Sequence, residues 1–195
     1  NQTARADEVT RAYEAAGAAA LSVLTDETYF GGTLADLRKA TQTVHIPVMR
    51  KEFIVDAYQL FEAKLAGAGA VLLIAAAITK HECRQLTELA HQLQLEVLLE
   101  LHDEQETEYI TPIHQLIGVN NRNLGSFVTD LQKSFRMAEL LPPDAIWVSE
   151  SGISDPTILK ELRHAGYQGF LIGENFMKTG DPGESLRHFL GGIEN

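Results

Sequence analysis

The chain has 195 residues, 45% hydrophobic and 22% charged, a composition that excludes wholesale disorder, a collagen-like repeat and a disulfide scaffold and predicts a single domain over residues 1–195. Its formal net charge of −11 disfavours nucleic acid and anionic membranes as partners, and no apolar run approaches the ~18 residues of a membrane span. The one cysteine, Cys83, excludes an intramolecular disulfide and favours a reducing, cytoplasmic location.

One type of helix-to-strand connection recurs along the chain. Helix-favouring segments that end at Gly17, Gly67 and Gly166 are each followed by a short apolar run. Glycine just past a helix supplies a left-handed cap, and a short apolar run without polar alternation is typical of a strand buried on both faces. This pattern predicts seven parallel strands, at Ala19–Leu24, Pro47–Arg50, Ala70–Ile74, Glu96–Glu100, Leu116–Asn120, Ile146–Ser149 and Gly169–Ile172.

Eight helices alternate with these strands, and the chain opens on a helix. The predicted helices are Asp7–Ala16, Leu34–Gln42, Asp56–Ala66, Thr79–Gln92, Asp103–Tyr109, Thr129–Leu141, Asp155–His164 and Pro182–Leu190. An alternating series normally begins with a strand. We therefore predict an α/β fold, a (β/α)8 barrel whose first strand is absent from this chain. An open, doubly wound sheet of seven strands is the alternative, because periodicity does not separate open from closed sheets.

Polar side chains follow six of the seven predicted strands. In parallel α/β folds this end of the sheet carries the functional site. Glu100 shares a strand face with Leu98, and Glu150 shares one with Val148, so we expect both carboxylates to point into the barrel. Charges placed there are costly unless they are paired or used in chemistry.

Simpler structural roles compete with chemistry for several of these residues. Lys51 could be a solvated loop base or the ion-pair partner of Glu100, Asn120 could cap a turn, and Arg122 could clamp a neighbouring carboxylate. His102 is expected to support a neighbour or cap a helix rather than to bind metal. No metal site is predicted, because no group of ligands has the required spacing.

Glycines follow the last two predicted strands, at Ser151-Gly152 and Gly173-Glu174. Backbone N–H groups freed by glycine can approach an anion, and a phosphate site after the last two barrel strands is a recurrent arrangement. Tight turns between strand and helix would use the same glycines. The pair of turns nevertheless favours phosphate binding.

Six stretches, taken together, resemble the indole-3-glycerol-phosphate synthase family and cover the chain in order. They are Leu21–Asp26 (LSVLTD), Pro47–Ile54 (PVMRKEFI), Ala70–Ile74 (AVLLI), Ile117–Leu124 (IGVNNRNL), Val148–Ile153 (VSESGI) and Phe170–Met177 (FLIGENFM). The resemblance implies ring closure, decarboxylation and dehydration of 1-(2-carboxyphenylamino)-1-deoxyribulose 5-phosphate, a small phosphorylated substrate, without metal or organic cofactor.

The same resemblance assigns roles to residues of this chain. Lys51 matches the general acid of ring closure, Glu100 the acid/base carboxylate of dehydration, and Asn120 and Glu150 the groups that shape and polarise the pocket. The phosphate-binding positions match Ser151, Gly152, Gly173 and Glu174, whose carboxylate should turn away from the anion. The substrate-lining positions match Ser22, Phe30, Phe53, Leu72, Arg122 and Leu124.

One motif of the family has no counterpart here. Its first strand carries E-x-K-x-x-S-P-S, and neither this segment nor the family's N-terminal helix is present. We interpret the chain as an N-terminally incomplete barrel, whose strand edges would permit self-association and whose own activity is open. Two other functions remain: a sister phosphate-barrel isomerase, with Asp26 as a candidate acid/base, and an inactive barrel remnant that acts through association.

Overall fold

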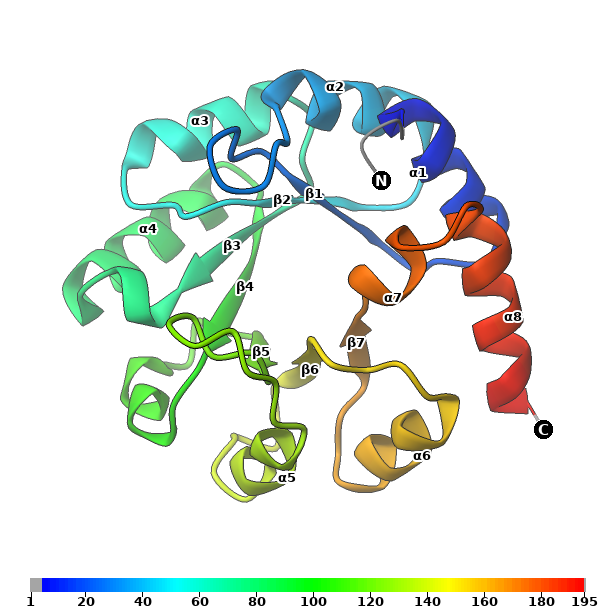
Figure 1. Ribbon diagram of the computed structural model, residues 1–195. Helices are drawn as coiled ribbons and strands as arrows, with labels where there is room; N and C mark the ends of the chain where they lie inside the picture. Colours follow the sequence, from blue (N-terminus) through cyan, green and yellow to red (C-terminus); the bar gives the residue numbers. More distant parts are fainter. Residues whose placement is uncertain (1–4, 195) are drawn as a thin grey trace.

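The computed structural model describes residues 5–194, which fold into one curled parallel sheet covered by helices (Figure 1). The strands are β1 (Leu21–Leu24), β2 (Val48–Lys51), β3 (Ala70–Ile74), β4 (Glu96–Leu101), β5 (Leu116–Asn120), β6 (Ile146–Glu150) and β7 (Gly169–Leu171). The helices are α1 (Ala6–Ala15), α2 (Leu34–Thr43), α3 (Ala57–Leu65), α4 (Lys80–Gln92), α5 (Gln132–Ala138), α6 (Pro156–His164), α7 (Glu174–Met177) and α8 (Pro182–Glu194), with 3-10 turns η1 (Ala75–Ala77) and η2 (Glu104–Tyr109).

Each strand pairs in parallel with the strand that follows it in the chain, so the order is β1 to β7. Figure 1 shows the sheet curling about a central axis with the helices on its outer side. Within residues 5–194 no pair joins β7 to β1. The predicted barrel class, with one strand lacking, is confirmed, and the doubly wound alternative is wrong because such a sheet carries helices on both faces.

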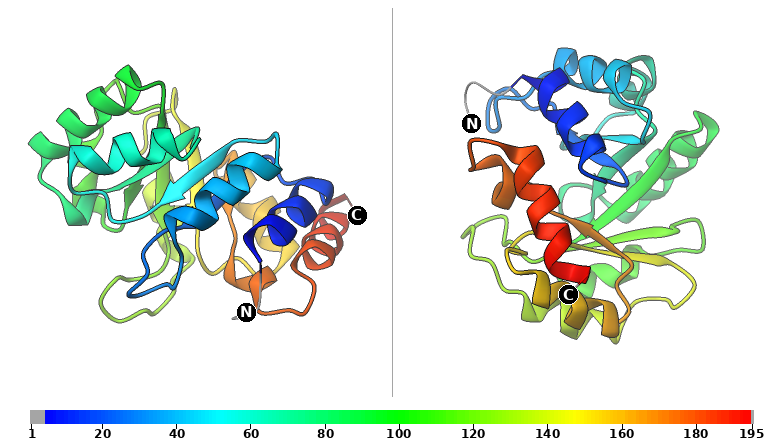
Figure 2. Two further views of the ribbon diagram at one scale, coloured as in Figure 1. Left: turned by 90° about the horizontal axis from the view of Figure 1, so that it is seen from above. Right: turned by 90° about the vertical axis from the view of Figure 1, so that its right-hand side faces the viewer.

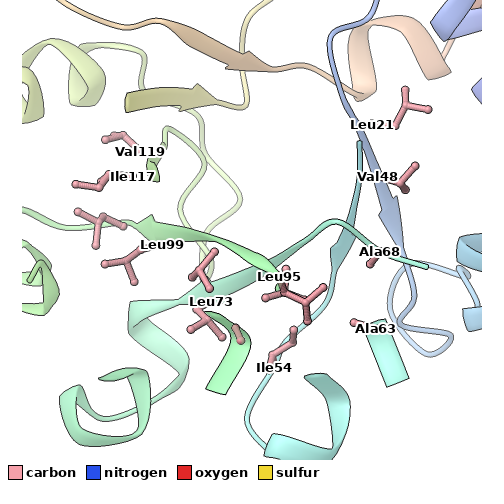
Figure 3. Close-up of a cluster of buried hydrophobic side chains, with 14 of the residues drawn as sticks. Leu21, Val48, Ile54, Ala63, Ala68, Leu73, Leu95, Leu99, Ile117 and Val119 are labelled. Atoms are coloured by element: carbon pink, nitrogen blue, oxygen red, sulfur yellow. The ribbon is translucent and has the colours of Figure 1, made fainter. Parts of the chain in front are cut away.

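The hydrophobic core has two parts, one on each face of the sheet. The larger part fills the space between strands and helices and includes Leu73, Leu99 and Ile117, none of which is exposed (Figure 3). The smaller part, Met49, Leu72, Ile74 and Leu98, fills the inside of the curled sheet. Because successive side chains of a strand face opposite ways, the strands β2 to β7 each contribute residues to both parts.

Side-chain caps explain where several helices begin. Thr79 and Glu82 form a reciprocal capping box at α4, and Asp56 and Gln59 form one at α3. Asp155 caps α6, with Pro156 at the first helical position. These caps satisfy N–H groups that have no partner inside the helix, so the helix starts were readable from sequence.

The first and last helices pack against each other across the opening between β1 and β7. Figure 2 shows α8 beside α1, and a Cβ placed on Gly183 would lie 2.7 Å from that of Ala12. Edge-to-face rings continue the junction: Tyr13 lies 6.3 Å from Phe176, which lies 5.4 Å from Phe189. The helical layer is therefore continuous where the sheet is open.

Three predicted elements need correction. The segment Asp103–Tyr109 forms the 3-10 turn η2 rather than an α-helix. The predicted helix Thr129–Leu141 shortens to α5, because Thr129 forms a β-bridge with Arg122. The short helix α7 was not predicted, so the eight α-helices of the described residues are not the eight expected from sequence. Among the described helices, none is both long and apolar enough to cross a bilayer.

Truncating a leucine between sheet and helices tests the position of the core. Leu73→Ala is expected to lower the free energy of unfolding by about 2–5 kcal/mol, because it leaves a cavity in a fully buried layer. The same change at Leu65, whose residue is 81% exposed, is expected to stay within about 0.5 kcal/mol. Urea denaturation of both variants measures the difference, and equal losses would contradict the assigned core.

Candidate active site

Three charged side chains meet inside the barrel at the carboxyl ends of β2, β4 and β6. The Nζ atom of Lys51 lies 3.2 Å from Oε2 of Glu100 and 3.8 Å from Oε2 of Glu150. The Lys51 side chain keeps 24% of its surface exposed, whereas each carboxylate keeps only 1%. The sequence placed both carboxylates on the interior face, and the structure brings them to the same ammonium.

His102 holds the second oxygen of Glu100. Its Nε2 atom lies 2.6 Å from Oε1 of Glu100, and its Nδ1 atom lies 3.1 Å from the backbone oxygen of Arg122. Both neighbours are acceptors, so each can accept a hydrogen bond from the ring nitrogen that faces it. The expected supporting role of His102 is confirmed, and its partner is the buried carboxylate.

Burial and charge separate the pKa values of the two carboxyl groups. Burial acts to raise the pKa of Glu100, but the His102 hydrogen bond and the charge of Lys51 outweigh it and bring that pKa to about 2. Burial, reinforced by the charge of Glu100, raises the pKa of Glu150 well above its ordinary value. The two pKa values are thus pushed apart, so that Glu100 ionises more readily than Glu150, the arrangement that acid/base chemistry uses.

Lys51 remains a charged proton donor in this setting. Burial acts to lower the pKa of its ammonium, but the charges of Glu100 and Glu150 outweigh that effect and the pKa is raised. An ammonium held between carboxyl groups can give a proton to an oxygen that develops negative charge.

Gly118 of β5 leaves the space that the Glu150 carboxyl occupies. Sequence analysis did not single out this glycine. A Cβ at this position would lie 2.1 Å from Oε1 of Glu150 and 3.4 Å from Cδ1 of Leu98. The signal was available, because a glycine inside a strand often marks the close approach of another group.

Asn120 is fixed by its own turn. Its Oδ1 atom accepts from the backbone N–H of Arg122 at 3.0 Å, and its backbone oxygen accepts from Nζ of Lys133 at 2.9 Å. The capping role considered for this amide is therefore present. Asn120 is 8% exposed and ends β5, the strand between those of Glu100 and Glu150.

The two glycine turns lie next to each other after β6 and β7. Glu150 pairs in register with Leu171, and the N–H of Ser151 donates to the oxygen of Leu171 at 3.4 Å. Ser151 and Gly152 both adopt left-handed backbone conformations, with φ of 67° and 75°. Gly173 caps the short helix α7.

The side chain of Glu174 turns toward Arg122, with which it forms an exposed ion pair. This is the clamp on a neighbouring carboxylate that was the structural alternative for Arg122. The Glu174 carboxylate is therefore paired with Arg122, a cation from the loop after β5.

The remaining predicted substrate residues divide between the interior and the rim. Leu72 is buried in the interior cluster, and Phe53 packs against it. Ser22 is exposed on β1, while Phe30 and Leu124 lie on loops with 52% and 40% of their surfaces exposed. In the part of the chain that the structure describes, no group of three or more His, Cys, Asp or Glu side chains is arranged to hold a metal ion.

A parallel barrel sheet with an ammonium and two carboxyls at the carboxyl ends of its strands defines an enzyme of the (β/α)8-barrel class. Comparison with known proteins gives the family. The family model described as indole-3-glycerol phosphate synthase matches residues 1–189, and the chain belongs to that family.

Curated relatives with the same name support the assignment. The indole-3-glycerol phosphate synthase of Bacteroides thetaiotaomicron is 58% identical over 193 residues, which are 99% of this chain and 74% of the relative. That of Koribacter versatilis is 48% identical over 91% of this chain and 69% of its own, and that of Burkholderia ambifaria 47% over 92% and 69%.

The buried, protonated state of Glu150 makes a prediction for stability. Above its ordinary pKa of 4.5 the residue ionises in the unfolded chain, whereas the folded chain keeps it protonated. This group therefore lowers the free energy of unfolding by about 1.4 kcal/mol per pH unit as pH rises from 4.5 toward its raised pKa. Glu150→Gln removes this loss. The free energy of unfolding of the variant should therefore rise relative to that of the wild type as the pH increases over that range.

Urea denaturation between pH 4 and pH 8 measures the gain, with Glu139→Gln as the exposed control. Glu100 does not confound the comparison, because its lowered pKa places its own contribution below pH 4.5. Wild-type and Glu150→Gln curves that stay parallel across the range would contradict a buried, protonated Glu150.

Proposed function

We propose that this chain carries the chemistry of indole-3-glycerol phosphate synthase on 1-(2-carboxyphenylamino)-1-deoxyribulose 5-phosphate. The observation that carries the proposal is the contact of the Lys51 ammonium with both Glu100 and Glu150 inside the barrel. The family membership of the chain, with relatives of that name at up to 58% identity among those compared, supports the same reaction.

Ring closure is assigned to Lys51. The aromatic carbon that bears the carboxylate bonds to the ketone carbon, and the ketone oxygen takes a proton from the ammonium to become a hydroxyl. The bond to the carboxylate then breaks and its electrons return to the ring as CO2 leaves. The raised pKa of Lys51 keeps it protonated for the first step.

Dehydration is assigned to Glu100. The carbon beside the ring nitrogen loses a proton and the new hydroxyl leaves as water. An ionised Glu100 accepts that proton and passes it to the departing oxygen, so the carboxylate is regenerated. Its pKa of about 2 keeps it ionised beforehand, and Glu150, whose pKa is raised, polarises the pocket around the sugar and amine together with Asn120.

The phosphate of the substrate is assigned to the two glycine turns, at Ser151, Gly152, Gly173 and Glu174. The adjacent positions of these turns support the assignment, as does the pairing of the Glu174 carboxylate with Arg122. The anthranilate ring is assigned to the apolar side chains of Phe30, Phe53, Leu72 and Leu124, with Ser22 and Arg122 also lining the site.

The proposal includes no cofactor, since every step is a proton transfer or a bond change within the substrate. The only partner proposed is that phosphorylated small molecule. A cytoplasmic location follows as part of the proposal from the single cysteine.

Lys51→Ala is expected to reduce turnover by at least 10³-fold, because no other described cation lies between the two carboxyl groups. Formation of the fluorescent indole product measures the rate. Lys160→Ala, an exposed lysine on α6, is the control and should retain the wild-type rate.

The assay is run on this chain and on the chain preceded by a segment with the family's first-strand motif. Activity in either form that vanishes in Lys51→Ala supports the proposal. Full turnover in Lys51→Ala would overturn the role of Lys51. Folded but inactive chains in both forms would favour the association alternative.

A further inference from the structure

A buried amide lies beneath the glycine turn after β6. Asn121, the residue after β5, is 1% exposed. Its Nδ2 atom donates to the backbone oxygens of Glu150 at 3.0 Å and Ser151 at 3.2 Å, and it lies 3.1 Å from Oγ of Ser149. One side chain thus holds the backbone carbonyls of Glu150 and of Ser151, the first residue of the turn.

The other end of the amide is fixed by α5. The Oδ1 atom of Asn121 accepts from the backbone N–H of Ser134 at 3.2 Å and from its Oγ at 2.8 Å. The hydroxyl of Tyr167 donates to the backbone oxygen of Ser134 at 2.7 Å, which anchors that residue in turn. Donors face Oδ1 and acceptors face Nδ2, so only one orientation of the amide satisfies all of its partners.

The turn above this amide has a backbone that needs support. Ser151 has φ of 67°, a backbone conformation that residues other than glycine rarely adopt. Gly152 continues it at φ of 75°, where a Cβ would lie 2.3 Å from Cγ2 of Thr129. The N–H of Ser151 donates to the oxygen of Leu171, so the donor that this turn can offer to an anion is the N–H of Gly152.

Competing explanations of this amide fail on its surroundings. It is not the N-cap residue of α5, which is Leu131, but its Oδ1 does accept from the N–H of Ser134 in the first turn of that helix. It is buried, so it does not touch substrate in the open barrel. Its side-chain hydrogen bonds all end on the backbone of residues 150–151, on Ser149 or on Ser134.

We propose that Asn121 is a positioning residue that holds the Ser151–Gly152 turn in its phosphate-accepting, left-handed conformation. It acts through the carbonyls of Glu150 and Ser151 and does not touch the ligand itself. The inference rests on the proposed function for the identity of the anion, and it extends that function to a residue outside the site.

Asn121→Asp is the sharpest variant. The carboxylate keeps the size of the amide and its acceptance from Ser134, but it cannot donate to the two carbonyls. The dissociation constant for inorganic phosphate, measured by titration calorimetry, should rise at least 10-fold. The backbone amide NMR signals of Ser151 and Gly152 should shift, which reports the turn without any ligand.

Asn123→Asp is the matched control. It adds the same charge two residues away, and its Oδ1 still accepts from the N–H groups of Gly125 and Ser126. Phosphate affinity should change less than twofold. Ser134→Ala, which removes the hydroxyl donor to Oδ1 together with its contact to Oγ of Ser149, is a milder second variant if Asn121→Asp does not fold. It should weaken phosphate binding in the same direction.

A double-mutant cycle with Ser151→Gly separates positioning from general stability. Glycine adopts the left-handed conformation without strain, so the cost of Asn121→Asp should shrink at least threefold when residue 151 is glycine. An equal cost in both backgrounds would overturn the proposal. So would wild-type affinity and unshifted Ser151 and Gly152 signals in folded Asn121→Asp.

The two proposals fail separately. If the wild-type chain does not bind phosphate while Asn121→Asp shifts the turn signals, the phosphate assignment of the proposed function fails and the backbone role of Asn121 stands. If the wild type binds phosphate and Asn121→Asp binds it equally well, only the inference about Asn121 fails.

Discussion

The barrel interior holds two carboxyl groups and one ammonium, and that imbalance governs the site. Lys51 can neutralise one buried negative charge, and a second in the same space would be costly. His102 decides which carboxyl is ionised, because it binds Glu100 and not Glu150. The scaffold must also make room, because the Glu150 carboxyl occupies the space that Gly118 leaves. The chemical asymmetry of the site is therefore a consequence of packing as much as of charge.

Much of the fold was predictable because each βα unit is specified locally. Short apolar runs locate the strands, and β3 and β5 begin and end where the sequence predicts. The misplaced elements depend on contacts between distant segments. The bridge of Thr129 to Arg122 removes the first turn of a helix that the pattern supports, and neither residue carries a signal for the other.

The site was predictable to a smaller extent. Alternation along β4 and β6 places Glu100 and Glu150 inside the barrel, and the parallel order brings Lys51 to the same edge. Which atoms meet is a matter of rotamers and of neighbouring backbone, so the contact of His102 with the oxygen of Arg122 could not be read from sequence. The same holds for Asn121, whose partners lie on β6, in the turn directly after it and on α5.

The junction of α1 with α8 differs from every other contact around the barrel. All strand pairs join neighbours in the chain, whereas this contact joins residues about 170 positions apart. Closing so long a loop costs roughly 2 kcal/mol more chain entropy than joining adjacent βα units. The barrel can therefore assemble unit by unit through local pairings, while the α1–α8 contact adds a long-range closure that slows folding. Since α8 is also the last of the described helices to be synthesised, the α1–α8 contact can form only after α8 has been translated.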